Sequence, residues 1–72
     1  MTIAEYRRTL GLSQEAFAEL LQLTSKGHVS EMEKANRASP EVALAIEAHS
    51  AGVIDAGVLN PVIAAARQAI AA

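Results

Sequence analysis

Two stretches separated by ten residues decide the fold: Gly11-Leu-Ser-Gln-Glu-Ala-Phe-Ala18 and Val29-Ser-Glu-Met-Glu33. In the first, Ser13 is typical of a helix N-cap, because its hydroxyl can accept from an unpaired amide of the first turn. Phe17, Ala18 and Leu21 then share one side of the helix that follows. The first stretch therefore predicts a short amphipathic helix starting near Gln14.

A further helix is expected to follow Thr24-Ser25-Lys26-Gly27, which are turn and cap residues, and to run to about Ala35. At 100° per residue its two sides differ in character. One side carries a narrow, largely apolar stripe made of Ser25, Val29, Met32 and Asn36. The other is broad and polar, with Lys26 at its flank, and is made of Gly27, Ser30, Glu31 and Lys34.

Two adjoining helices of this kind, the second with a polar face, form the pattern of a DNA-binding helix-turn-helix. The close crossing needs a small residue in the first helix, and Ala18 fits. The second helix needs apolar anchors, which Val29 and Met32 supply. Its N-terminal half must offer hydrogen-bonding groups to base edges, and this set is Lys26, Gly27, His28, Ser30 and Glu31.

The rest of the chain also has the residue pattern of helices. We therefore expect an all-α fold: one compact bundle of about five short helices over residues 1–72. Thr2 and Glu5 predict a capping box for a helix ending near Leu10, with Gly11 as its C-terminal glycine. Ser39-Pro40-Glu41 starts a helix to about Ser50, ended by Gly52 and burying Val42, Ala45 and Ile46. Asp55 could cap one turn, and Asn60-Pro61 starts a last helix, about 61–71.

Composition excludes several classes of function. The chain has no cysteine, so thiolate metal sites and cysteine nucleophiles are absent, and His28 and His49 lack metal-ligand spacing. There is no Gly-rich phosphate loop and no His–acid pair, so we expect neither enzyme activity nor a cofactor or metal. No apolar run could cross a membrane, which predicts a cytoplasmic protein. The net charge is −2, and this excess lies in residues 41–72 (one Arg against three acids), whereas residues 1–40 balance.

On the two opening stretches the chain resembles the Cro/lambda-repressor-like (XRE) helix-turn-helix family over roughly residues 3–50. The tail, Ser39-Pro-Glu-Val-Ala-Leu-Ala-Ile-Glu-Ala with Gly52-Val-Ile-Asp and Leu59-Asn-Pro61, is similar to small phage Cro-like regulators and YdaS-type antitoxins. The chain departs from the family in two places. Gln22 stands where the family usually has glycine, and the turn around Thr24-Ser25 is one residue longer.

The resemblance implies roles for individual residues. Gln14 would contact a phosphate and brace the recognition helix, and Arg7 and Glu33 would form a salt bridge that ties the first helix to the third. The predicted DNA-binding set combines base-edge and backbone contacts: Gln14, Ser25, Lys26, Gly27, His28, Ser30, Glu31, Lys34, Asn36 and Arg37. Lys26 could read guanine and Glu31 could accept from cytosine, whereas Asn36 and Arg37 suit the DNA backbone.

An apolar stripe in the C-terminal part could cover the protein's own core or form a dimer seam; it consists of Leu59, Val62, Ile63, Ala66 and Ile70. One recognition helix reads few base pairs, which favours the seam. We therefore predict a homodimeric, sequence-specific DNA-binding transcriptional regulator, a repressor on a short palindromic operator, whose recognition helices lie about 34 Å apart. The alternative is an antitoxin or adaptor whose main partner is another protein, such as a toxin.

Overall fold

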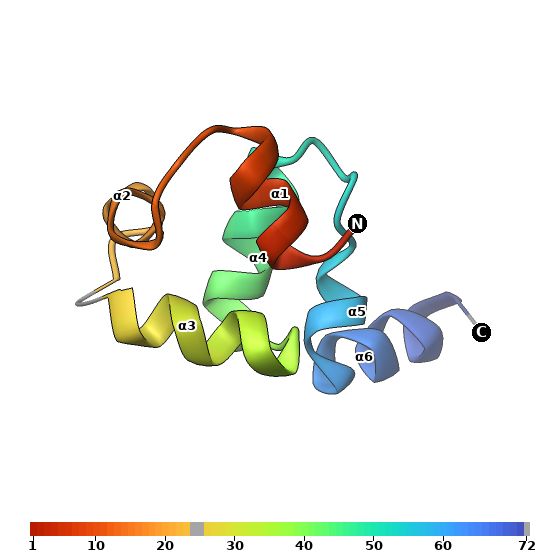
Figure 1. Ribbon diagram of the computed structural model, residues 1–72. Coiled ribbons are helices and arrows are strands. Elements are labelled where there is room, and N and C mark those ends of the chain that lie inside the picture. The colour runs from red at the N-terminus through yellow and green to blue at the C-terminus, as the bar shows by residue number, and fades with distance from the viewer. Residues whose placement is uncertain (24–25, 72) are drawn as a thin grey trace. The chain divides into compact units, whose positions relative to one another are not determined.

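The computed structural model describes residues 1–23 and 26–71, and within these ranges it is helical with no strand (Figure 1). The all-α class is thus confirmed. The one turn expected after Asp55 is a helix of its own, so six helices are present where about five were predicted. None of the described helices is long and apolar enough to cross a membrane. The helices are α1 (Ile3–Thr9), α2 (Gln14–Leu20), α3 (Lys26–Ala35), α4 (Pro40–His49), α5 (Ala56–Leu59) and α6 (Pro61–Ala71).

Side-chain caps begin most of these helices, as the sequence predicts. The Thr2 hydroxyl accepts from the Glu5 amide at 3.1 Å, and the Thr2 amide donates to Glu5 Oε1 at 2.8 Å, which completes the capping box of α1. Ser13 accepts from the Ala16 amide at 3.1 Å at the start of α2. Asp55 accepts from the Gly57 amide at the start of α5. Ser39 precedes α4 without a side-chain cap bond, so Pro at the first helical position marks that start.

The chain divides into two units, Met1–Asn36 and Arg37–Ala72. In the first, α3 packs against both α2 and α1. The ring of Phe17 is fully buried and meets Tyr6 edge to face, with the ring centroids 6.2 Å apart and the planes at 72°. Ile3 and Val29 are also fully buried. Three short helices thus share one small core, and burial of these apolar side chains stabilises their packing.

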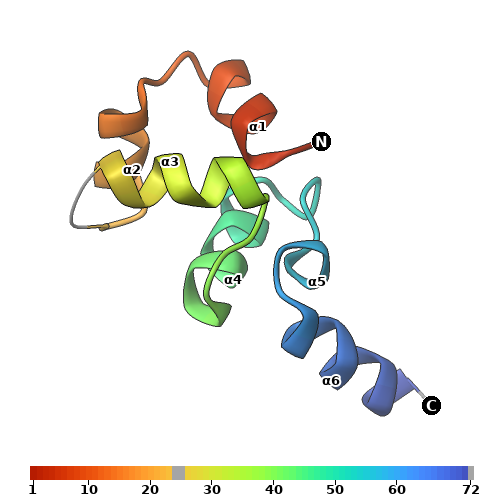
Figure 2. The same cartoon turned by 60° about the horizontal axis from the view of Figure 1, so that its bottom comes forward.

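In the second unit, α5 packs against α4 on one side and α6 on the other (Figure 2). The buried face of α4 differs from the expectation: Ala43 and Ile46 are buried, whereas Val42 and Ala45 are half-buried. The reason is that the inward face of α4 is the row Ala43, Ile46 and Ser50, which are three and four residues apart and so lie on one side of the helix. Ser50 is satisfied there, because its hydroxyl accepts from the Ile54 amide and donates to a carbonyl of α4.

Three of the helices end in the same left-handed turn, in which the next two amides bond back to the last turn of the helix. At the end of α1 the left-handed residue is Gly11, as predicted, with φ +70°. At the end of α2 it is Gln22, with φ +59°, and at the end of α4 it is Ala51, with φ +53°. Gly52 was expected to end α4, but it stands one residue later. Gln22 and Ala51 therefore occupy positions where a Cβ atom is unfavourable.

Replacing Ala51 with glycine is expected to stabilise the protein by about 0.5–1 kcal/mol, because glycine adopts a positive φ without the steric cost of a Cβ. The same change three residues earlier, Ala48→Gly at the exposed next-to-last position of α4, should instead destabilise by about 0.5 kcal/mol, because glycine loses more backbone entropy than alanine in a helix. Urea denaturation followed by circular dichroism measures both. If both variants changed the free energy of unfolding in the same direction, the left-handed conformation at residue 51 would be contradicted.

Candidate nucleic-acid interface

The interface is built on α3, which is attached to its unit along one narrow side. Val29 is 0 % exposed and Met32 is 4 % exposed, one turn apart on the side that meets α2. From α2, Ala18 is 3 % exposed, and its small side chain suits a close helix crossing. The predicted structural roles of Ala18, Val29 and Met32 agree with this burial. Anchoring along one side leaves the residues on the opposite side of α3 largely exposed.

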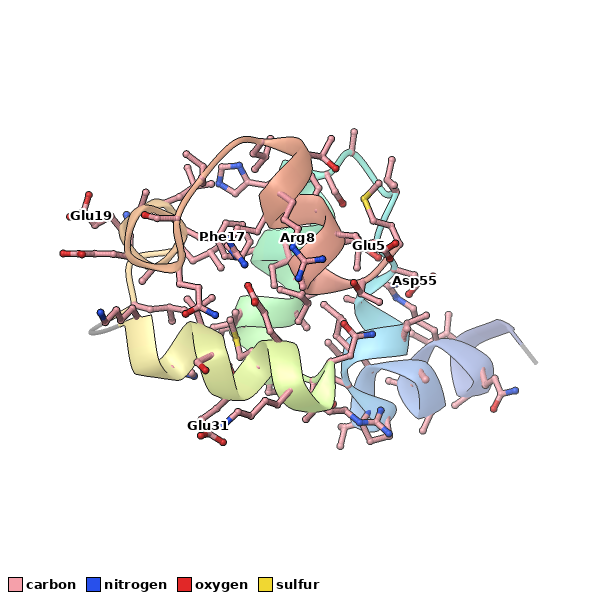
Figure 3. All side chains as sticks on the ribbon, in the orientation of Figure 1. Glu5, Arg8, Phe17, Glu19, Glu31 and Asp55 are labelled. Atoms are coloured by element: carbon pink, nitrogen blue, oxygen red, sulfur yellow. The ribbon has the colours of Figure 1, made fainter. Side chains whose placement is uncertain are left out.

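The outward side of α3 consists of residues that can bind a polyanion and hydrogen-bond to base edges. Lys26, Gly27, His28, Glu31 and Lys34 are exposed, and Ser30 is half-buried. Glu31 projects from α3 on the side away from α1 and α2 (Figure 3). Lys34 Nζ lies 4.0 Å from Glu31 Oε1, with both side chains largely exposed, so the two remain free to take other partners. Two lysines against one exposed carboxylate make this side positively charged.

A polar cluster fixes α3 to α1 and α2. Arg7 Nε donates to Glu33 Oε2 at 2.5 Å, and Arg7 Nη2 donates to Glu33 Oε1 at 3.3 Å. Gln14 Nε2 reaches the same Oε1 at 3.1 Å, and Arg7 Nη1 donates to the Leu12 carbonyl oxygen at 2.9 Å. The expected Arg7–Glu33 salt bridge is therefore present. One carboxylate on α3 is held from both preceding helices, which sets the angle at which α3 is presented.

The cluster also neutralises the charge of Glu33, whose carboxylate is bound by Arg7 and Gln14. Burial would raise the pKa of Glu33, but the hydrogen bonds from Arg7 and Gln14 outweigh it and hold this pKa below its ordinary value. The hydrogen bond to Glu33 in turn raises the pKa of the Arg7 guanidinium. Both groups stay charged and compensate each other, with only 15 % and 10 % of their side chains exposed. Glu33 therefore presents little uncompensated charge to a phosphate backbone.

The remaining predicted contacts lie around α3 in different settings. Gln14 is half-buried and braces α3 through Glu33, the second of its two expected roles. Asn36 follows α3 with φ +51°, and its Oδ1 accepts from the Ile3 amide at 3.0 Å, so this side chain is engaged inside its own unit. Arg37 is exposed and follows directly. Ser25 falls outside the described residues.

The backbone conformation at Gln22 shows how the chain accommodates glutamine where the resemblance would place glycine. Its backbone is left-handed, a conformation that glycine adopts most readily, and its amide and that of Leu23 close the end of α2. The backbone at residue 22 therefore has the conformation that a glycine would favour, although the side chain is larger. Replacing the family's usual glycine with glutamine leaves the end of α2 formed as expected for the motif.

The residues of the predicted C-terminal apolar stripe differ in burial, so they do not form one surface. Leu59 is 0 % exposed and ends α5, so its side chain belongs to the protein's own core and not to a surface seam. The reason is the extended backbone at Asn60, which breaks the helical spacing that the stripe assumed. Ile63 is half-buried. Val62, Ala66 and Ile70 are exposed and remain candidates for a dimer contact.

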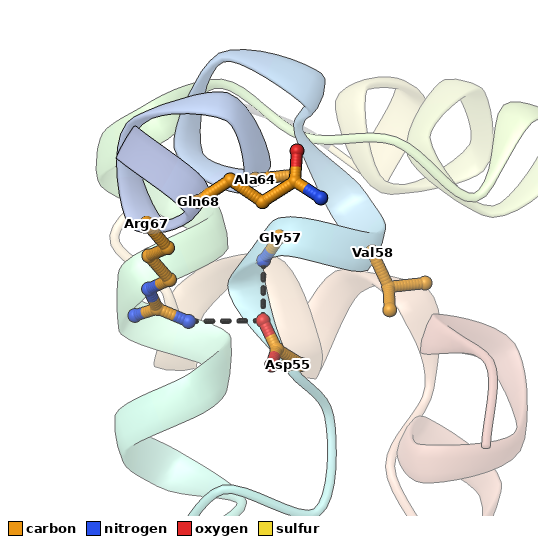
Figure 4. Close-up of a pocket in the computed structure, with 6 residues that line it drawn as sticks. All are labelled: Asp55, Gly57, Val58, Ala64, Arg67 and Gln68. Atoms are coloured by element: carbon orange, nitrogen blue, oxygen red, sulfur yellow. Dashed lines mark hydrogen bonds and ion pairs between the residues drawn. The ribbon is translucent and has the colours of Figure 1, made fainter. Parts of the chain in front are cut away.

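The sequence analysis did not predict an ion-pair network in the second unit. Arg67 on α6 donates to both carboxylate oxygens of Glu47, at 2.7 and 2.8 Å. It also donates to Asp55 Oδ1 at 2.9 Å (Figure 4). The hydrogen bonds from Arg67 and from the Ala56 amide lower the pKa of Glu47 to about 2. The partners are 20 and 12 residues apart in the chain, and only the tertiary fold brings such distant charges together.

Comparison with known proteins agrees with this geometry. A family model described as helix-turn-helix matches residues 3–49, which is 47 of the 72 residues and covers all of α1 to α4. No curated protein and no solved structure matched the chain. The match spans the Arg7–Glu33 pair, the crossing at Ala18 and the polar side of α3. The chain therefore belongs to the XRE family of helix-turn-helix proteins, which bind DNA and regulate transcription.

Proposed function

We propose that this protein is a sequence-specific repressor that binds a short palindromic operator as a homodimer, with α3 in the major groove. The observation that carries the proposal is the one-sided anchoring of α3. Val29 and Met32 hold it, and the Arg7–Glu33 pair orients it, while its positively charged side stays exposed. An α-helix with such a side fits the width of the major groove.

The contacts divide by chemistry into base readout and backbone attraction. Lys26 and Ser30 lie in the N-terminal half of α3, the part of a recognition helix that contacts base edges. Glu31 can accept a hydrogen bond from the amino group of cytosine, which a lysine cannot do. Arg37 is exposed after the end of α3 and suits a phosphate. Base-edge contacts determine which sequence is bound, and phosphate contacts supply affinity that is independent of sequence.

Selection of binding sites from random duplexes tests the proposal. Lys26→Ala and Ser30→Ala should each relax the preference at particular base pairs, at a cost of about 1–3 kcal/mol on the selected site. Arg37→Ala should weaken all duplexes alike and reduce the salt slope of binding by about 1. With few cations on α3, the full slope should be shallow, on the order of −3 to −6 for a dimer.

A matched control comes from α2 of the same unit. Glu19 is exposed and points away from α3 (Figure 3), and Glu19→Gln should leave the selected sequence unchanged. Equal affinity of the unmodified protein for random duplexes and for its own selected site would refute specific regulation. A change of base preference in Arg37→Ala, with none in Lys26→Ala or Ser30→Ala, would refute the assignment of base readout to α3.

A further inference from the structure

The linker that leads into α4 consists of Arg37, Ala38 and Ser39, and it is fixed to its unit at its middle residue. The Ala38 amide donates to the Leu59 carbonyl oxygen at 3.1 Å, and the Ala38 carbonyl oxygen accepts from Asn60 Nδ2 at 2.9 Å. Both backbone groups of Ala38 are thus hydrogen-bonded to the junction of α5 and α6. Arg37, one residue earlier, is exposed.

The side chain of Asn60 can hold the linker because it is itself held in place. Asn60 is only 9 % exposed, and its backbone amide donates to the Ala56 carbonyl oxygen at 3.0 Å. Its Oδ1 accepts from the Val62 amide at 2.9 Å, which makes Asn60 the N-cap of α6. Because the side-chain amide is planar, fixing its oxygen also fixes the direction of its nitrogen. The oxygen of Asn60 therefore starts α6, and its nitrogen holds the linker.

We propose that Asn60 is a positioning residue for DNA binding: by holding Ala38, it keeps the backbone that carries Arg37 ordered for contact with a phosphate. The proposal rests on the proposed function, which includes the phosphate contact of Arg37. A cation on a free linker must be ordered when DNA binds, and ordering its backbone and its long side chain costs free energy. Ala38 is already hydrogen-bonded in the free protein, so less of this cost remains.

This role is separate from that of the helix-turn-helix and from any pairing of two copies. The family model ends at residue 49, so α5 and Asn60 lie beyond it. Their hydrogen bonds nevertheless act on the residue directly after Arg37. Through these bonds we expect the C-terminal segment to contribute to the DNA affinity of a single copy of the chain.

Asn60→Ser separates the two roles of the side chain. Serine is a favourable N-cap, so α6 keeps its start, but the side chain is too short to reach the Ala38 carbonyl oxygen. In the free protein, amide hydrogen exchange at Ala38 should accelerate by about tenfold. The Ser50 amide, which donates to the Ile46 carbonyl oxygen in the same unit, should keep its rate. No acceleration at Ala38, or the same acceleration at both amides, would show that Asn60 does not hold the linker.

DNA affinity is then measured on the selected site and on a random duplex, because a phosphate contact is independent of sequence. Asn60→Ser should weaken binding to both duplexes alike, by about three- to tenfold, and should move the salt slope toward that of Arg37→Ala. In a double-mutant cycle, adding Asn60→Ser to Arg37→Ala should change the affinity by less than about twofold. If the two losses multiplied instead, Asn60 would act independently of Arg37 and the proposal would be overturned.

The matched control is Ser50→Ala, which removes another buried polar group from the same unit. Ser50 is 6 % exposed, and its hydroxyl accepts from the Ile54 amide. The variant leaves the bonds to the linker in place, so its salt slope should equal that of the unmodified protein. A change of slope as large as that in Asn60→Ser would mean that any loss of stability in this unit has the same effect, and Asn60 would have no specific role.

A second variant covers the case in which the smaller serine prevents folding. Asn60→Asp keeps the size of the side chain and the oxygen that caps α6, and it removes the donor to Ala38. The effect of its added charge is measured separately with Gln68→Glu, at an exposed position of α6. If the cycle links Asn60 to Arg37 on random duplexes while no site is selected, the positioning role stands and the sequence-specific function fails.

Discussion

Replacing Arg7 with methionine is expected to lower the free energy of unfolding by about 2–4 kcal/mol, because it leaves the carboxylate of Glu33 without its main partner in a shielded position. The side chains of the pair are 15 % and 10 % exposed, so water compensates only in part. Methionine keeps much of the aliphatic length of arginine, which limits the effect to the lost charge and hydrogen bonds. Urea denaturation gives the change directly.

The effect should extend to DNA, because Glu33 belongs to α3 and the pair sets the angle of that helix. Under conditions in which the variant remains folded, its operator affinity should fall more than the loss of one exposed cation explains. The matched control is Arg8→Met on the same helix, where the side chain is exposed and forms no ion pair in the described part of the chain; it should change stability by about 0.5 kcal/mol or less. Similar stability losses in the two variants would contradict the structural role of Arg7.

The pH dependence of stability gives an independent check on the pair. The folded-state pKa of Glu33 lies below its ordinary value of 4.5, so the folded state stabilises the ionised form. This contribution is present above pH 4.5 and is lost as the pH falls through the folded-state pKa. Glu47 contributes in the same direction, down to a pKa of about 2. The decline below pH 5 should therefore be less steep in Glu33→Gln than in the unmodified protein, but it should not disappear.

Replacing Phe17 with alanine is expected to cost about 3–5 kcal/mol, since it removes a fully buried ring and leaves a cavity. The edge-to-face contact with Tyr6 is lost as well. A chain of 72 residues has a total stability of only about 4–10 kcal/mol, so a large fraction of the variant should be unfolded at 37 °C. Thermal melting followed by far-ultraviolet circular dichroism measures this.

The control for Phe17 lies on the same helix. Leu20 is 38 % exposed, so Leu20→Ala removes an apolar side chain that is only partly shielded and should cost about 1 kcal/mol or less. Phe17→Leu, which retains much of the apolar volume, should fall between the two alanine variants. If Phe17→Ala melted within a few degrees of the unmodified protein, Phe17 could not be the centre of the core that holds α1 and α2 together.

The helix-turn-helix could be predicted from local patterns because each of its signals depends on residues close in the chain. Ser13 caps α2, Gly11 ends α1, and Val29 and Met32 lie one turn apart, so helical geometry alone places them. The Arg7–Glu33 pair, although 26 residues apart, was predicted from the family resemblance and not from spacing. The same local reasoning predicted Asp55 as the cap of α5.

The tertiary structure decided what local periodicity cannot determine. Leu59 is in the core because the extended backbone at Asn60 interrupts the helical stripe, and the face of α4 turned inward is that of Ala43, one position from the prediction. The capture of Arg67 by Glu47 and Asp55 joins segments far apart in sequence. Sequence by itself determined where most helices begin and end to within one or two residues, because caps and periodicity act over a few residues. Which faces are buried, and which charges meet, followed from packing, because burial is a property of the neighbours that the folded chain brings together.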